Sequence, residues 1–239
     1  MNNDTVKKER WHLAQAQERR WWEEKMAALD FSYFARFAME LQEIVAEEAA
    51  VKEHTRILEI GCGPAGILTH LDARFRIGMD PLERFYGAID KCRLYRDPGV
   101  RYLAAKGEGL PFGDGSFDLI IIDNILDHCE DIDAVVQEMK RALATNGIIY
   151  LRNFTVTEWG FFLAEVIEFF RIDRGHPYHF REKDLHMLFS RHGLKPVLIK
   201  RRGFMANTGM LLSSMKLSGI LRALSCSIGD KALFVLRSA

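Results

Sequence analysis

The sequence predicts an α/β protein in which a mostly parallel sheet carries helices on both faces. Three observations lead to this fold class. After His54, short β-type runs alternate with helical patterns, a glycine-rich turn follows the first of these runs, and residues 117–122 read FDLIII without polar alternation. The alternation is typical of parallel sheets with crossover helices, and an uninterrupted apolar run is expected of a strand buried on both faces.

The first fifty residues carry a helical pattern of a different kind. Apolar residues recur there at helical spacing in two stretches, Trp11, Trp22, Met26 and Leu29, then Phe34, Ala38, Leu41 and Val45. Asp30 lies between the stretches and is expected to be the N-cap of the second helix. We therefore predict a helical N-terminal cap over residues 1–54 and one α/β domain over residues 55–239.

The remaining elements follow from periodicity and turn signals. Strands are predicted at residues 56–60, 75–79, 100–104, 117–122, 148–151, 194–200 and 231–236. Helices are predicted from the glycine-rich turn to Leu71, at 82–93, after the N-cap Asp131, and at 158–170, 181–192 and 211–224. Asn146-Gly147 is expected to end the helix that begins after Asp131.

Composition limits the classes of partner and the compartment. Lys plus Arg and Asp plus Glu each total 33, so the formal net charge is zero and no overall field attracts nucleic acid or an anionic membrane. A small-molecule partner is therefore favoured. The four cysteines have neither a C-x-x-C pair nor a zinc-site spacing, so we expect no metal site and reduced thiols. Without an apolar leader or a bilayer-length apolar run, a cytoplasmic location is expected. Nothing in the sequence predicts the oligomeric state.

The most informative stretch is ILEIGCGPAGILTHL at residues 57–71. Glycines after a strand permit a sharp turn and the close approach of a ligand to the backbone. Gly61, Gly63 and Gly66 spell G-x-G-x-x-G, which fits a nicotinamide or flavin dinucleotide as well as an adenosyl ligand. Asp80 ends the neighbouring strand, where a carboxylate can accept hydrogen bonds from both ribose hydroxyls. Asp80 could instead cap the helix near Leu82.

The context of this motif resembles one family. The sequence contains, in order, EIGCG at 59–63, GMDP at 78–81, EGLPF at 108–112 and NILDH at 124–128. This order is similar to that of the class I S-adenosylmethionine-dependent methyltransferases, above all the type-11 group related to ubiquinone and menaquinone methyltransferases. The resemblance covers roughly residues 56–151. It implies a Rossmann-like seven-stranded sheet whose last strand is antiparallel, with the N-terminal helices over the mouth of the cofactor site.

The resemblance also implies roles for individual residues. The methionyl end of S-adenosylmethionine is expected at Glu59, Gly61 and Gly63, with Cys62 as a small spacer in the turn. Asp80 is expected at the ribose, Pro81 along the adenine, and Gly107 and Glu108 near the adenine edge. Asn124 is expected to line the floor below the sulfonium. Lys106 departs from the family pattern, since an acidic or amide residue is common there, and Glu108 could also be an ordinary loop carboxylate.

The implied reaction is in-line displacement of the methyl group, which leaves S-adenosylhomocysteine. The protein then has to align the reactants and exclude water. If the acceptor must lose a proton early, His128 is the first candidate for a general base and His179 the second. Each has a structural alternative, because His128 can stabilise the loop before Asp131 and His179 lies in an aromatic cluster.

The acceptor is expected to be a small molecule such as a sugar, a lipid-linked intermediate, a quinone-type compound or another metabolite. Four aromatic residues of the N-terminal cap favour a ring or a hydrophobic chain, Trp21, Trp22, Phe31 and Tyr33. Three alternatives stay open. They are an NAD-dependent oxidoreductase, which would not need the EGLPF segment, a catalytically silent cofactor-binding module, and a nucleic-acid methyltransferase, which the zero net charge disfavours.

Overall fold

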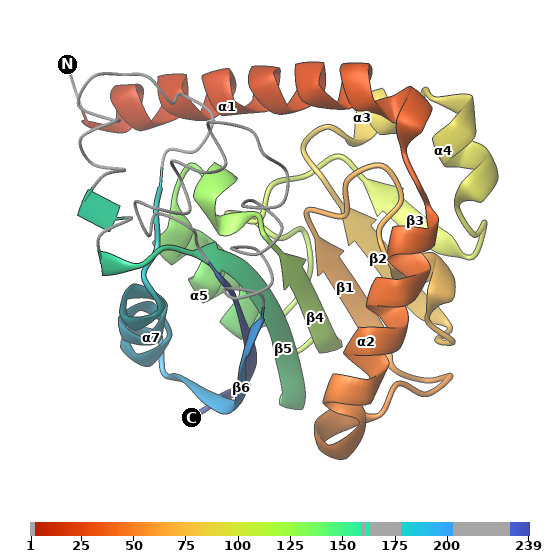
Figure 1. Ribbon diagram of the computed structural model, residues 1–239. Helices are drawn as coiled ribbons and strands as arrows, with labels where there is room; N and C mark the ends of the chain where they lie inside the picture. The colour runs from red at the N-terminus through yellow and green to blue at the C-terminus, as the bar shows by residue number, and fades with distance from the viewer. Residues whose placement is uncertain (1–2, 159–160, 163–177, 203–229) are drawn as a thin grey trace.

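The computed structural model of the protein describes residues 3–158, 161–162, 178–202 and 230–239 (Figure 1). Within these residues, seven strands form one sheet in the order β3-β2-β1-β4-β5-β7-β6. They are β1 (Arg56–Ile60), β2 (Phe75–Met79), β3 (Val100–Leu103), β4 (Phe117–Asp123), β5 (Leu143–Thr155), β6 (Leu194–Arg202) and β7 (Asp230–Ser238). The first five strands pair in parallel and β7 is antiparallel to β5 and β6. The predicted Rossmann-like sheet with an antiparallel last strand is confirmed.

Helices cover both faces of the sheet. They are α1 (Asn3–Lys25), α2 (Ser32–Ala49), α3 (Glu83–Tyr86), α4 (Asp90–Tyr95), α5 (Ile132–Ala142) and α7 (Glu182–Arg191). Apolar residues of α2 pack with one face of β1, β4 and β5, and those of α5 and α7 pack with the opposite face. Along β4, Leu119 and Ile121 pack on the side of α2, whereas Ile120 and Ile122 pack on the side of α5 and α7. Residues 119–122 are all apolar because both faces of the strand are buried.

Helix α1 occupies a different position from the other helices. It crosses the edge of the sheet at which the parallel strands end, along the top of the molecule in Figure 1. Of its side chains from Lys8 to Lys25, only that of Ala14 is buried, and most of the others are exposed. α2 therefore belongs to the layer that packs on the sheet, whereas α1 covers its end.

Two of the predicted helices are shorter in the structure than the sequence predicts. The chain after the glycine-rich turn makes only a 3-10 turn at Leu68–His70, because Gly66 adopts φ +66° and the Ile67 N–H donates to the Glu59 carboxylate at 3.0 Å. A side-chain acceptor thus takes the place of a helical carbonyl. The predicted helix at 82–93 is divided into α3 and α4, because Ile89 adopts an extended backbone, with φ −92° and ψ 117°.

The predicted ends of the helices agree only in part with the structure. Asp131 is the N-cap of α5, and its Oδ1 accepts the Ala134 N–H at 3.1 Å, as predicted. Asp30, predicted as the N-cap of α2, is not in that position, because the helix begins at Ser32 and its N-cap is Phe31, which makes no side-chain cap. The Asp30 carboxylate instead accepts the Ser32 N–H at 2.9 Å, one residue before the cap. Asn146-Gly147 does not end α5, because the helix stops at Ala142 and this pair lies inside β5, where the register against β4 shifts.

The helix predicted at 211–224, most of that predicted at 158–170, and Cys226 lie outside the described residues.

Candidate functional site

A cavity of about 820 Å³ lies at the carboxyl ends of β1, β2 and β4, beneath α1. Parallel strands bring the loops that follow them to one edge of the sheet, so motifs far apart in the sequence meet there. All nine positions predicted to contact a cofactor are in its lining, Glu59, Gly61, Cys62, Gly63, Asp80, Pro81, Gly107, Glu108 and Asn124. His128 also lines the cavity, whereas His179 does not.

The glycine-rich turn wraps the end of β1 in left-handed conformations. Gly61, Gly63 and Gly66 have φ of +72°, +59° and +66°. The Gly61 N–H donates to the Met79 carbonyl at 2.7 Å, which ties the turn to the end of β2. A Cβ at Gly61 would collide with the Ile125 side chain in the loop after β4. Glycine is therefore needed here for both backbone conformation and space.

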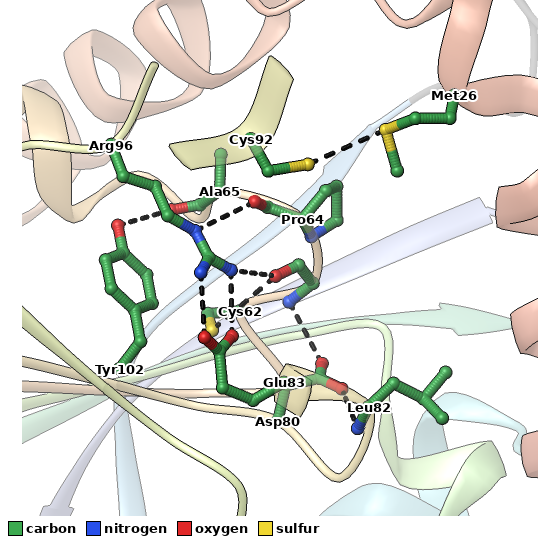
Figure 2. A network of polar contacts seen from close by, with 11 residues as sticks. Met26, Cys62, Pro64, Ala65, Asp80, Leu82, Glu83, Cys92, Arg96 and Tyr102 are labelled. Carbon is green, nitrogen blue, oxygen red and sulfur yellow. Dashed lines mark hydrogen bonds and ion pairs between the residues drawn. The ribbon is translucent and has the colours of Figure 1, made fainter. Parts of the chain in front are cut away.

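Arg96, just after α4, holds this turn from outside the cavity (Figure 2). Its guanidinium donates to the carbonyls of Pro64 at 3.0 Å and Gly63 at 3.3 Å, and forms a two-pronged ion pair with Glu83 at 2.8 Å. The Arg96 and Glu83 side chains are only 7% and 12% exposed, and the guanidinium lies 3.9 Å from the centroid of the Tyr102 ring. Sequence reasoning missed this clamp, since no local motif predicts the pairing of an arginine with a turn thirty residues away.

Asp80 faces the cavity and also organises the loops around it. The residue is 8% exposed, its Oδ2 accepts the Gly63 N–H at 3.0 Å, and its Oδ1 accepts the Leu82 N–H at 2.8 Å (Figure 2). The bond to Leu82 agrees in part with the alternative that Asp80 caps the helix near Leu82, but Asp80 still lines the cavity. Burial raises the pKa of Asp80 to about 6, and the charges of Glu18 and Glu83 act in the same direction.

Glu59 is the most deeply placed carboxylate of the site. It is 5% exposed and accepts the Ile67 N–H with both oxygens, at 3.0 and 3.3 Å. Burial raises the pKa of Glu59 to about 8, while the hydrogen bonds from the backbone of Ile67 and Leu68 oppose that change. Its carboxylate braces the turn below the cavity.

The predicted adenine edge is built by the loops after β3 and β4. Glu108 Oε1 accepts the Glu130 N–H at 2.7 Å, so Glu108 holds the segment before α5 while lining the cavity. Lys106, the residue that departs from the family pattern, pairs with Glu130 at 2.8 Å. Its ammonium also lies 3.4 Å from the centroid of the Trp11 ring, which attaches α1 to this edge.

The floor of the cavity is made by Asn124 and the residue before it. Asn124 has φ +55°, a conformation that asparagine tolerates better than most residues, and its Oδ1 accepts the Phe154 N–H at 2.9 Å. Asp123 forms a two-pronged ion pair with Arg152 at 2.6 and 2.7 Å, and Arg152 donates to the Tyr33 hydroxyl at 2.8 Å. Burial, with the charge of Asp123, raises the pKa of Tyr33 to about 12.

The charge of the lining is mainly negative. Among the described lining residues there are five acidic side chains, Glu18, Glu59, Asp80, Glu108 and Asp123, against a single lysine or arginine, Lys231 of β7. The pKa of about 8 keeps Glu59 largely protonated at neutral pH, and Asp123 is paired with Arg152, so the negative charge comes mainly from Glu18, Asp80 and Glu108. Burial lowers the pKa of Lys231. The cavity is therefore suited to a ligand that carries positive charge.

The two histidines considered as bases occupy different environments. His128 Nε2 lies 3.6 Å from Asp127 Oδ2 in the cavity wall. His179 stands between Tyr178 and Phe180, whose rings stack with centroids 6.4 Å apart, and Phe180 belongs to the core below α5 and α7. The geometry favours packing as the role of the segment around His179.

Sequence reasoning also missed Glu18 and Lys231 as lining residues. Trp11 and Trp22 were placed on one helical face, and the same periodicity includes Glu18, seven residues after Trp11 and four before Trp22. Lys231 carried no such signal, because its position depends on the insertion of β7 beside β5.

The described part of the chain contains neither a membrane-spanning helix nor a cluster of metal-binding side chains. None of its helices combines the length and hydropathy needed to cross a bilayer. No group of three or more His, Cys, Asp or Glu side chains is placed to hold a metal ion in these residues.

Residues 58–151 match a family described as a methyltransferase domain, of type 11. The chain is 30% identical over 109 residues to an uncharacterised protein of Methanocaldococcus jannaschii, a match that covers 44% of this chain and 49% of that protein. It is 28% identical over 102 residues to the ubiquinone biosynthesis O-methyltransferase of Rhizobium johnstonii, covering 41% of each. The chain thus spans less than half the length of these two relatives.

The fold is shared with solved methyltransferases. The geranyl diphosphate C-methyltransferase of Streptomyces coelicolor, solved with S-adenosyl-L-homocysteine, has a TM-score of 0.63 against this chain, at 14% identity, over 85% of this chain and 80% of that one. At this identity the likeness concerns the fold. Residues 58–151 therefore match the type-11 methyltransferase domain in sequence, and the described fold is that of class I S-adenosylmethionine-dependent methyltransferases.

Proposed function

We propose that the protein transfers the methyl group of S-adenosylmethionine to a small-molecule acceptor. The observation that carries this proposal is the convergence of four motif segments on one cavity within a methyltransferase domain. The names of the relatives support it, since they include ubiquinone biosynthesis O-methyltransferases and a geranyl diphosphate C-methyltransferase. We also propose that the chain divides at residue 54, into an N-terminal helical part, residues 1–54, and a methyltransferase domain, residues 55–239. Within the first part α1 caps the cavity, and α2 packs on the sheet.

The residues present fit an adenosyl sulfonium. The left-handed turn at Gly61 and Gly63 leaves room for a ligand against the backbone, and the buried Asp80 carboxylate offers acceptors to ribose hydroxyls. Glu59 braces the turn that holds the methionyl end, and Cys62, a buried thiol whose pKa is raised by burial, is a spacer in it. Pro81, Gly107 and Glu108 frame the adenine, and Asn124 lies below the sulfonium.

The cofactor supplies both the electrophilic methyl group and the thioether leaving group. The chain has to bind, align and exclude water, and α1 together with the aromatic side chains of the cap closes the cavity from above. Where the acceptor must lose a proton, His128 is the base, with the Asp127 carboxylate 3.6 Å from its Nε2. His179 would need a rearrangement of the packed Tyr178–Phe180 segment to take this role.

The acceptor lies beyond Asn124, where Tyr33, Phe34 and Phe37 of α2 line the cavity. These rings favour an acceptor with a ring or a hydrophobic chain, such as a quinone-type or lipid-linked metabolite, over a plain sugar.

Ligand-dependent thermal unfolding tests the cofactor. S-Adenosylhomocysteine at about 100 times its Kd adds about 2.7 kcal/mol to the stability of the native state, which for a chain of this size corresponds to a rise in Tm of roughly 5–10 °C. NAD at the same concentration is expected to leave Tm unchanged. A shift with NAD and none with S-adenosylhomocysteine would identify the protein as a dinucleotide-binding oxidoreductase.

Methyl transfer itself is tested with S-adenosylmethionine labelled on the methyl group. We expect label in phenolic or lipid-linked acceptors from a panel that also contains sugars, RNA and DNA. Binding of S-adenosylhomocysteine without transfer to any member of the panel or to a cell extract would favour the catalytically silent module.

A further inference from the structure

Helix α1 meets the rest of the molecule through a narrow stripe of side chains that line the cavity. Five of its members recur at helical spacing on one side of the helix, Trp11, Ala14, Gln15, Glu18 and Trp22, and Gln17 and Trp21 line the cavity beside them. Outside this stripe most of the helix is exposed. The inner side of α1 is thus shaped around the volume that the proposed cofactor occupies, and contributes little to either core of the sheet.

Glu18 stands in the middle of this stripe and is held in place. Trp22 Nε1 donates to Glu18 Oε1 at 2.7 Å, and the Trp22 ring lies edge-on to Tyr86 of α3 with centroids 6.0 Å apart. The Trp22 ring also lies beside Gly63, since a Cβ added at Gly63 would be 4.0 Å from the ring. These contacts fix the carboxylate above the turn and above the end of β2, and its Oε2 has no hydrogen-bond partner among the described residues.

Asp80 lies across the cavity lining from Glu18, at the end of β2. Both side chains line the same cavity. Burial raises the pKa of Asp80, and the negative charge of Glu18 acts in the same direction, so the two carboxylates are near enough to repel each other. Two carboxylates that line one cavity and repel each other are an unfavourable arrangement in the free protein. A ligand with two adjacent hydroxyl donors would satisfy both.

We propose that Glu18 binds the ribose together with Asp80, each carboxylate accepting one of the two adjacent hydroxyls, so that the cofactor fastens α1 over the cavity. This inference rests on the proposed function, because it takes the ligand to be an adenosyl compound. The ligand class is a nucleoside with a free cis-diol.

Replacement of Glu18 by Gln tests the contact with little change of shape. The single amide oxygen can serve either Trp22 or the ribose, so one charge-assisted hydrogen bond is lost. We expect the Glu18→Gln variant to bind S-adenosylhomocysteine about 10-fold more weakly by calorimetric titration, the loss typical of a hydrogen bond to a charged group. Glu24→Gln is the matched control, since Glu24 is exposed on the same helix and does not line the cavity.

Adenosine, 2′-deoxyadenosine and 3′-deoxyadenosine separate a ribose contact from a structural role. If Glu18 accepts one hydroxyl, the variant loses affinity for adenosine and for the nucleoside that keeps that hydroxyl, but not for the nucleoside that lacks it. An equal loss for all three nucleosides, or no loss for any, would overturn the proposal. Hydrogen exchange gives an independent readout, because S-adenosylhomocysteine should protect α1 amides in the wild type and in Glu24→Gln more than in Glu18→Gln.

The two levels of inference fail in different ways. Absence of S-adenosylhomocysteine binding by the wild-type protein contradicts the proposed function and the role of Glu18 together. Wild-type binding that Glu18→Gln leaves unchanged contradicts the role of Glu18 alone.

Discussion

Gly61 is required by two independent features of its surroundings. Its φ of +72° lies in the left-handed region, which costs other residues roughly 1–2 kcal/mol, and a Cβ there would collide with Ile125. We expect Gly61→Ala to lower the free energy of unfolding by about 2–4 kcal/mol, the sum of backbone strain and overpacking, and to abolish measurable binding of S-adenosylhomocysteine.

Gly109→Ala is the control for this substitution. Gly109 has no positive φ and an added Cβ would meet nothing within 4 Å, so the variant should unfold in urea within about 0.5 kcal/mol of the wild type. If both substitutions changed the free energy of unfolding equally, neither the left-handed backbone nor the contact with Ile125 at Gly61 would be supported.

Asp80 should make cofactor affinity depend on pH. Ribose hydroxyls donate to the ionised carboxylate, and its pKa of about 6 in the free protein means that affinity rises as the pH increases through that value. We expect S-adenosylhomocysteine to bind several-fold more tightly at about pH 7.5 than at about pH 5, and Asp80→Asn to bind more weakly and to lose this step. Titrations across this range check the prediction, and a step that persists in Asp80→Asn would assign it to another group.

At the scale of elements, short segments far apart in the sequence hold one another in place. Arg96, which follows α4, bonds to the carbonyls of the turn after β1 and to Glu83 of α3. The sequence predicted one helix over this region, because the apolar periodicity continues through Gly87 and Ile89. The division into α3 and α4 lies at Ile89, whose extended backbone apolar periodicity does not predict.

Arg96→Met should therefore affect both stability and binding. Removing one partner of a buried ion pair leaves the Glu83 carboxylate uncompensated, which typically costs about 3–5 kcal/mol, and two carbonyls of the turn lose their donor. Arg93→Met, three residues earlier in α4, is the control, since Arg93 is 63% exposed and its pair with Asp90 should contribute less than about 1 kcal/mol. Urea unfolding of the two variants checks this, and similar losses would contradict the clamp.

The arrangement of the strands was more predictable than that of the helices. Every predicted strand is present because runs such as FDLIII and the turns between them are local signals, and the nine motif positions line one cavity because parallel topology gathers strand ends. Local sequence could not place Glu18 or Lys231, whose positions depend on how α1 crosses the sheet edge and where β7 is inserted.

At the scale of the whole molecule, buried carboxylates make the free protein less stable at higher pH. Glu59 has its pKa raised from 4.5 to about 8, so its protonated form is favoured in the folded state. Its contribution to stability is fully present below about pH 4.5 and is lost as the pH rises through about 8.

Glu59→Gln isolates this contribution. The variant keeps an acceptor for the Ile67 N–H without a titrating group, so the difference in free energy of unfolding between variant and wild type should change by a few kcal/mol in favour of the variant between about pH 5 and pH 8, at about 1.4 kcal/mol per pKa unit. Chemical denaturation in the absence of ligand at these two pH values checks it. If the difference in free energy of unfolding between variant and wild type were the same at both pH values, the pKa of Glu59 would not be raised.

The acidic side chains around the cavity have a consequence for turnover. S-Adenosylmethionine carries one more positive charge than the thioether that remains after its methyl group has left. A negatively charged cavity therefore attracts S-adenosylmethionine more strongly than S-adenosylhomocysteine. Loss of the methyl group thus lowers the affinity of the cavity for the product. Product inhibition by the thioether should accordingly become stronger, relative to cofactor affinity, when these acidic side chains are neutralised one at a time.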